Sequence, residues 1–291
     1  MAQVLKPPAK FLELRAHVVT PADLPKARAM CPGYDQNRWR AEELAAHLCR
    51  WLPEWALRYG ERPDTATMME MARRAALKVY ASDAYEGRGE LGELLLHAVI
   101  RHEFETDIAV SKIFYKDSAN DTVKGFDCVH ISQAADGKLD LWLGEAKLYT
   151  RRSDAIASAA EELREHLERK YLRDEFAMVV GKIEATFPFA EDLRELLDEE
   201  RPLDQIVDRL RVPVFLAYDA KFIQEFQKVD DEFVAAMEAE AKAARQALID
   251  KLDQAPLPQD LVIDLIVLPV ENKKRLTELF HKELRQWQGQ A

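Results

Sequence analysis

The sequence lacks several features that would assign it directly to a well-defined class. It contains no apolar run close to the roughly 20 residues that span a bilayer, so we expect no membrane association. Its three cysteines, Cys31, Cys49 and Cys128, lie far apart and form no CxxC or Cys/His pattern, which argues against a zinc site. A glycine-rich loop of the P-loop type is also missing. The first ten residues are interrupted by proline and lack an apolar stretch, so we expect no secretion signal, a cytoplasmic location and reduced thiols.

The sequence also carries an excess of acidic residues, with a formal net charge of -11. Attraction to nucleic-acid phosphates needs local positive potential, so this charge taken alone argues against DNA binding. A basic patch is nevertheless sufficient. Five basic residues gather around the candidate site and are predicted to contact DNA: Lys112, Lys116, Lys124, Arg151 and Arg152. For each of them taken singly, an ordinary solvated face is the simpler interpretation.

Strand patterns alternate with helix patterns along the chain, which predicts a mixed α/β fold. Helices are predicted at 41–51, 65–81, 87–102, 153–171, 233–252 and 271–288. Strands are predicted at 11–19, 108–115, 125–132, 139–149, 176–180, 212–218 and 261–270. Five residues of the second helix are expected in the core: Met68, Met69, Met71, Ala75 and Leu77.

One charged triplet, Glu145-Ala146-Lys147, stands out because of its position in a predicted strand. Triplets of the form [DE]-x-K are common in this chain and have little value alone. Alternate residues of a strand share a face, so Glu145 and Lys147 continue a row begun by Leu139, Leu141 and Leu143. Two charges on an otherwise apolar face require a partner.

The preceding strand supplies that partner if the two strands form a hairpin around Asp136-Gly137. A turn centred on Asp136 places Val129 opposite Leu143 and Asp127 opposite Glu145. Two carboxylates that close repel each other unless a proton or a cation lies between them. A hard divalent cation, Mg²⁺ or Mn²⁺, is the expected occupant, because such ions prefer oxygen ligands.

A predicted helix before the hairpin carries two more acids, Glu90 and Glu93, on one face. Either can serve as a further metal ligand, and Glu93 is the preferred candidate. Gly89 and Gly92 would allow this helix to approach the sheet closely. Such a cation would activate water for attack on a phosphodiester, while Lys147 would position the nucleophile or stabilise the developing charge. The structural alternative is that Asp127, Glu145 and Lys147 form only an ion-pair cluster.

This order of elements resembles the PD-(D/E)xK, or restriction-endonuclease-like, superfamily of nucleases, although Phe126 replaces the proline before Asp127. The segments RGELGELLLHAV, SKIFYKDSANDTVKGFD and LWLGEAKLY also resemble the HamA family, the nuclease subunits of Hachiman anti-phage defence systems. The resemblance implies a restriction-endonuclease-like mixed sheet flanked by helices, with added N-terminal and C-terminal elements. It implies catalytic roles for Asp127, Glu145, Lys147 and the helical acid Glu93. It also implies DNA as substrate and a superfamily-2 helicase, HamB, as partner.

The resemblance divides the chain into an N-terminal α/β extension over 1–85 and a nuclease domain over 86–291, with its catalytic core at about 87–180. Two other functions stay open at this stage. The first is a catalytically inactive DNA-binding or scaffolding subunit of a helicase complex. The second is a small-molecule or protein-interaction domain that carries a structural ion-pair cluster.

Overall fold

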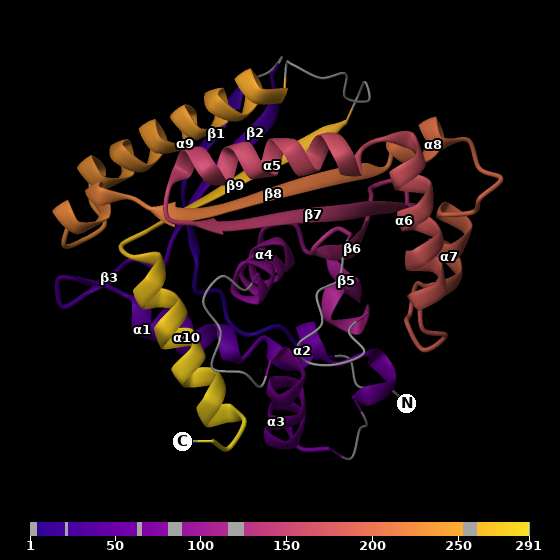
Figure 1. Ribbon diagram of the computed structural model, residues 1–291, viewed down its shortest axis with the longest axis horizontal. Coiled ribbons are helices and arrows are strands. Elements are labelled where there is room, and N and C mark those ends of the chain that lie inside the picture. The colour runs from indigo at the N-terminus through magenta and orange to yellow at the C-terminus, as the bar shows by residue number, and fades with distance from the viewer. Residues whose placement is uncertain are drawn as a thin grey trace.

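The computed structural model describes residues 5–20, 23–62, 66–80, 89–115, 125–252 and 261–290. Its centre is a seven-stranded sheet with the order β1-β2-β9-β8-β7-β6-β5 (Figure 1). The strands are β1 Glu13–Thr20, β2 Asp23–Cys31, β5 Asp107–Ser111, β6 Cys128–Gln133, β7 Leu139–Tyr149, β8 Leu210–Asp219 and β9 Val262–Val270. A separate two-stranded ribbon consists of β3 Tyr34–Asp35 and β4 Arg38–Trp39.

Parallel and antiparallel pairing coexist in this sheet. The pairs β2–β9, β9–β8 and β8–β7 are parallel, whereas β7–β6, β6–β5 and β1–β2 are antiparallel. The parallel strands are almost continuously apolar, as expected when helices cover both faces of a sheet. The predicted α/β class, with a mixed sheet flanked by helices, is therefore confirmed.

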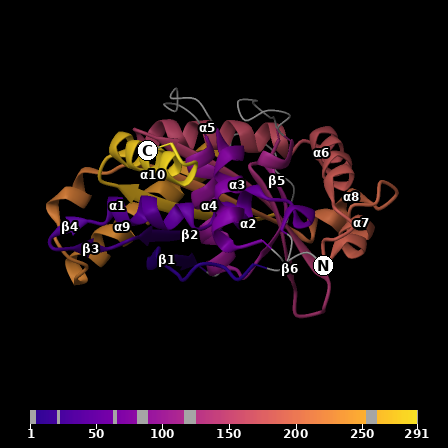
Figure 2. The ribbon, with the colours of Figure 1, turned by 90° about the horizontal axis from the view of Figure 1, so that it is seen from below.

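Helices cover both faces of the sheet (Figures 1 and 2). The helices α5 Arg152–His166 and α9 Asp231–Leu252 lie over one face. The opposite face carries α4 Glu90–Glu103, together with α1 Ala41–Cys49, α2 Leu52–Ala56, α3 Met68–Val79 and α10 Lys273–Trp287. The helices α6 Arg169–Lys182, α7 Ala190–Leu196 and α8 Leu203–Val207 follow α5 and lie beside the β6–β7 end of the sheet.

The close approach predicted for α4 is present. A Cβ added at Gly92 would lie 3.5 Å from the Cβ of Leu148 and 3.6 Å from that of Ala146. Those two residues are the even-numbered positions of β7, so α4 packs on the face opposite to Glu145 and Lys147. Gly92 therefore allows α4 to contact β7 closely on the face away from the side chains of Glu145 and Lys147.

Several predicted elements differ from the structure. Residues 176–180 lie in α6 and not in a strand, because Leu172, Phe176 and Val179 are buried at helical spacing. The single helix predicted over 153–171 is two helices, since α5 ends at His166 and α6 begins at Arg169. The strand predicted over 108–115 ends at Ser111 and continues as the 3-10 helix η2 Lys112–Tyr115.

The strand β2 was not predicted, because its Pro25 reads as a break in a strand pattern. Pairing of β2 with β9 begins only at Lys26, so the missing amide of Pro25 interrupts no bond of that ladder. The same sheet thus contains both N-terminal strands and the candidate hairpin. The proposed boundary at residue 85 falls among residues 81–88, which lie outside the described residues, and it stays a prediction.

The core prediction for α3 is partly wrong. Met71 is buried, whereas Met68, Met69 and Leu77 are 55%, 83% and 46% exposed. The buried positions of this amphipathic helix are Met71, Ala72, Ala75, Ala76 and Val79. None of the described helices is both long and apolar enough to cross a membrane.

Candidate active site

The predicted hairpin register is confirmed. Val129 pairs with Leu143, and Ile131 pairs with Leu141. The regular pairing ends at Cys128 opposite Gly144. The amide of the preceding residue, Asp127, donates to the carbonyl of Gly144 at 2.9 Å, and its carboxylate accepts from the amide of Ala146, so Asp127 lies beside residues 144–146 of β7. The turn contains Gly137 at φ +79°, a conformation that favours glycine.

Asp127 is buried and held by two hydrogen bonds. Its Oδ2 accepts from the amide of Ala146 at 2.8 Å, and its Oδ1 accepts from the ammonium of Lys112 at 2.8 Å. Burial disfavours the charged form of Lys112, but the carboxylates of Asp127 and Glu93 outweigh it and raise the pKa of this lysine. Lys112, predicted from the sequence as a DNA contact, thus lies within the carboxylate cluster.

Glu145 is the most deeply buried acid of the site, with 1% of its surface exposed. Its Oε1 lies 2.5 Å from Nδ1 of His166, and its Oε2 accepts from Lys147 Nζ at 3.4 Å. Burial raises the pKa of Glu145 well above its ordinary value, and the neighbouring charge of Asp127 raises it further. The carboxylate is therefore held here against an electrostatic cost.

Lys147 points toward α5. Its ammonium donates to Glu162 Oε2 at 2.5 Å in addition to Glu145. Burial lowers the pKa of this lysine, but the carboxylates of Glu145, Asp127 and Glu162 reverse that effect, so the pKa is raised. We call these residues together the α5-face cluster: Lys112, Asp127, Glu145, Lys147, Glu162 and His166.

Two members of the α5-face cluster, Glu162 and His166, were not predicted from the sequence. The available signal was their spacing of four residues, which places both side chains on one face of the helix that follows the Glu-x-Lys strand. Among the described residues, Glu145, Glu162 and His166 form a group of three potential metal ligands whose ligand atoms lie within 4.8 Å of one another. Two carboxylates and an imidazole are suitable donors for a divalent ion.

The helical acids predicted as metal ligands lie on α4. Glu90 and Glu93 are both buried in the first turn of α4, on the opposite face of β7. The charge of Glu93 acts on Lys112, which places this acid near the Asp127 corner of the cluster. Neither acid belongs to the three-ligand group, and the metal-binding roles of Asp127, Glu93 and Glu90 stay predictions.

The ring of His166 is fixed by aromatic neighbours. It stacks on Tyr171 with centroids 4.4 Å apart and meets Phe126 edge-on at 5.0 Å. Near His166, burial raises the pKa of Glu175 to about 7, although a hydrogen bond from the Phe126 backbone opposes this shift. Gly125 has φ +113°, and a Cβ there would lie 2.8 Å from a carboxylate oxygen of Glu175, so this position requires glycine.

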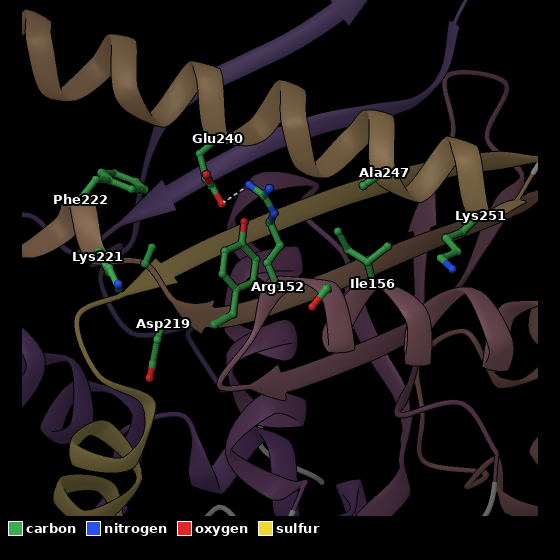
Figure 3. Close-up of a pocket in the computed structure, with 11 residues that line it drawn as sticks. Arg152, Ile156, Asp219, Lys221, Phe222, Glu240, Ala247 and Lys251 are labelled. Carbon is green, nitrogen blue, oxygen red and sulfur yellow. Dashed lines mark hydrogen bonds and ion pairs between the residues drawn. The ribbon is translucent and has the colours of Figure 1, made fainter.

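The other predicted DNA contacts are dispersed. Arg151 is exposed and pairs with Asp154 at 2.7 Å. Arg152 donates to Glu240 at 2.8 Å inside a pocket of about 610 Å³ near the carboxyl end of β8 (Figure 3). This pocket lies at the first turn of α5, whereas Glu162 and His166 lie in its last turns, roughly 15 Å further along the helix. Lys116 and Lys124 lie outside the described residues.

The fold and this cluster together define an α/β protein whose mixed sheet carries a buried Glu-x-Lys centre on one strand. The model of the HamA family matches residues 9–284, so the chain belongs to the HamA family. The chain is also similar to a protein of Escherichia coli (strain K12) named "Anti-bacteriophage protein A", with 25% identity over 283 residues. That match covers 93% of this chain and 51% of the relative, so the chain spans about half the length of that protein.

Proposed function

We propose that this chain is a metal-dependent DNA nuclease that acts in anti-phage defence. The observation that supports this proposal best is the pair of buried carboxylates, Asp127 and Glu145, on neighbouring strands with Lys147 beside them. Isolated buried acids protonate or take a cation. The defence role follows from membership of the HamA family and from the name of the bacterial relative.

Each residue of the site has its own proposed role in the reaction. A bound Mg²⁺ or Mn²⁺ would supply an activated water and shield the phosphoryl oxygens. Asp127 and Glu145, with Glu93 or Glu90, would hold that ion. Lys147 carries a fixed positive charge in a buried place, where it can stabilise the negative charge that develops on phosphate. Lys112 neutralises Asp127 until substrate or metal arrives.

A superfamily-2 helicase, HamB, is the proposed partner. The net charge of -11 makes autonomous binding of DNA unfavourable, so delivery of DNA by a helicase is consistent with the chain's composition. Co-purification of the two proteins from one strain tests this partnership. Separate elution, together with full phage protection by this chain alone, would contradict it.

A catalytically inactive DNA-binding or scaffolding subunit of the helicase complex is the second candidate. The burial of Glu145 and the pairing of both Lys112 and Lys147 with carboxylates are compatible with it, since a purely structural cluster would have the same contacts. The two candidates differ in whether the purified chain cleaves DNA.

The deciding experiment incubates the purified chain, with and without its helicase, on linear and circular DNA with Mg²⁺ or Mn²⁺. Cleavage should occur in the wild type, disappear with excess EDTA, and be absent in Glu145→Gln and Asp127→Asn. Glu161→Gln is the matched control, because Glu161 is exposed on α5 next to the cluster. Cleavage that persists in chelator or in both acid variants would overturn the proposal.

A further inference from the structure

Helix α5 adds a nitrogen ligand to a group of carboxylates. Glu162 and His166 project from neighbouring turns of α5 toward Glu145 of β7, and the three ligand atoms lie within 4.8 Å of one another. Glu145 and His166 are 1% and 7% exposed, so most of this group is removed from water. The group is distinct from the Asp127 corner, where Lys112 and the charge of Glu93 are found.

The imidazole of His166 is pre-positioned for binding. Tyr171 stacks on one side of the ring at 4.4 Å, and Phe126 contacts it at 5.0 Å. These contacts direct Nδ1 toward Glu145 Oε1 at 2.5 Å. A ligand whose ring is already fixed loses little conformational freedom on binding.

The charges of the cluster favour a cation at this point. The carboxylates of Asp127, Glu145 and Glu162 face the ammonium groups of Lys112 and Lys147, so negative groups are in excess. One cation is already present, because the ammonium of Lys147 lies 2.5 Å from Glu162 and 3.4 Å from Glu145. Both observations indicate that the place attracts positive charge.

We propose that Glu145, Glu162 and His166 form a second cation site that prefers Mn²⁺, or another divalent transition ion, over Mg²⁺. Imidazole suits transition ions, whereas Mg²⁺ and Ca²⁺ prefer sites built from oxygen alone. Glu145 is shared with the ion expected at Asp127, as in two-metal phosphodiester chemistry. Lys147 then loses Glu162 as its partner, and its ammonium becomes available to a substrate phosphate. The assignment rests on the proposed nuclease function for its role.

The test measures the ion and not the reaction. Mn²⁺ is titrated into the wild type and the variants without DNA, and binding is followed by electron paramagnetic resonance. Pulsed measurements on the bound ion report a directly coordinated nitrogen through its hyperfine coupling. The wild type should show this nitrogen signal. His166→Gln should lose it and bind Mn²⁺ at least tenfold more weakly, with Ca²⁺ binding unchanged.

Two further variants sharpen the result. Glu162→Gln changes a partly exposed side chain and is compatible with folding. This variant should bind Mn²⁺ at least tenfold more weakly, and at saturation it should retain the nitrogen signal. Glu161→Gln, one residue away and exposed, should match the wild type. Mn²⁺ affinity within twofold of wild type in both His166→Gln and Glu162→Gln, or a nitrogen signal that survives in folded His166→Gln, would overturn the assignment.

The outcome separates this inference from the proposed function. Mn²⁺ binding that depends on His166 in a chain that cleaves no DNA would support the second site and contradict the nuclease proposal. Cleavage of DNA with Mn²⁺ binding that is insensitive to His166 and Glu162 would contradict the second site alone.

Discussion

Two buried polar clusters lie on opposite faces of the β6–β7 hairpin, and their charge balance differs. The first is the α5-face cluster around Asp127, Glu145 and Lys147. The second, which we call the α4-face cluster, is built by residues of α2, α4, the β5 start and β6: Glu54, His97, Arg101, Thr106 and His130. Most members of both clusters are buried, although Glu162 and Lys112 of the α5-face cluster are partly exposed.

The α4-face cluster is balanced in charge. Arg101 donates to Glu54 at 2.5 Å and also to the carbonyl of Thr106. His130 bridges the hydroxyl of Thr106 at 2.8 Å and the ring of His97 at 3.2 Å. Burial lowers the pKa of both histidines well below the ordinary value, so these rings are neutral. Arg101 also pairs with Asp107 at 3.1 Å, and the charge of Arg62 acts on Glu54 as well, so two guanidinium groups face two carboxylates.

The α5-face cluster is unbalanced, because carboxylates outnumber ammonium groups and the pKa of Glu145 is raised by burial and by Asp127. Natural cores rarely retain such an arrangement without a use, and perturbed acids concentrate at functional sites. The comparison indicates that the charge excess distinguishes the α5-face cluster as the candidate functional site. The two clusters should therefore respond in opposite ways to substitution.

The largest expected effect is on catalysis. Lys147→Met should reduce DNA cleavage by roughly 10²–10³-fold, because it removes the fixed positive charge beside the phosphate. The unfolding temperature should change less than for removal of Arg101, since Glu162 is partly exposed and can be solvated, and Glu145 keeps His166 as a partner and has a raised pKa that favours its neutral form. Rates of DNA cleavage measured beside a thermal melt check both parts. Lys78→Met is the control, because this lysine of α3 pairs with Glu61, outside both clusters. Undiminished cleavage by Lys147→Met would show that the lysine is structural.

The α4-face cluster should show the reverse behaviour. Arg101→Leu should lower the free energy of unfolding by about 3 kcal/mol, because it leaves the buried carboxylate of Glu54 without its cation. Cleavage per folded molecule should be retained. Denaturant unfolding is the measurement, and the double variant Glu54→Gln/Arg101→Leu should recover part of the loss. If Arg101→Leu alone were as stable as the wild type, the predicted difference between the two clusters would be wrong.

A smaller effect concerns Glu175, which lies against Gly125 beside the α5-face cluster. Its pKa is raised to about 7 by burial, so the unfolded chain releases this proton at lower pH than the folded chain does. Stability therefore falls as pH rises from about 4.5 to about 7. Glu175→Gln should be more stable than the wild type by about 2–3 kcal/mol at pH 8, with a small difference near pH 4.5.

Chemical denaturation at the two pH values checks this prediction. Glu168→Gln serves as the control, because Glu168 is exposed at the start of α6 and should show no pH-dependent gain. An equal effect of Glu175→Gln at both pH values would mean that Glu175 is not the titrating group.

The hairpin and its two central acids could be predicted from the sequence, whereas the contribution of α5 could not. Period-two alternation in β7 and the Asp136-Gly137 turn determine the register, which ends at Cys128 opposite Gly144 and brings Asp127 next to the Glu145 segment of β7. Whether His166 reaches Glu145 depends on where α5 crosses β7. That position is set by packing between residues distant in sequence.

The errors in the predicted secondary structure have a similar origin, because they also depend on contacts between residues distant in sequence. A short apolar run such as 176–180 fits a strand or one face of a helix equally well, and only the contacts of Leu172 and Phe176 decide between them. Glu93 lies on α4, which packs on the other face of β7, while its charge acts on Lys112, so its predicted role as a metal ligand stays a prediction. Spacing along one element does not reveal which face of a second element it meets.

The measurement that tests this account most directly is calorimetric unfolding of the wild type and Glu145→Gln, each with and without Mn²⁺. A charge-excess cluster built for a cation predicts that metal-free Glu145→Gln is at least as stable as the metal-free wild type. It also predicts that Mn²⁺ raises the unfolding temperature of the wild type only, because an ion that binds the folded state stabilises it. A metal-free Glu145→Gln that is clearly less stable than the wild type, with no effect of Mn²⁺ on either protein, would show that the cluster is structural and contradict the account.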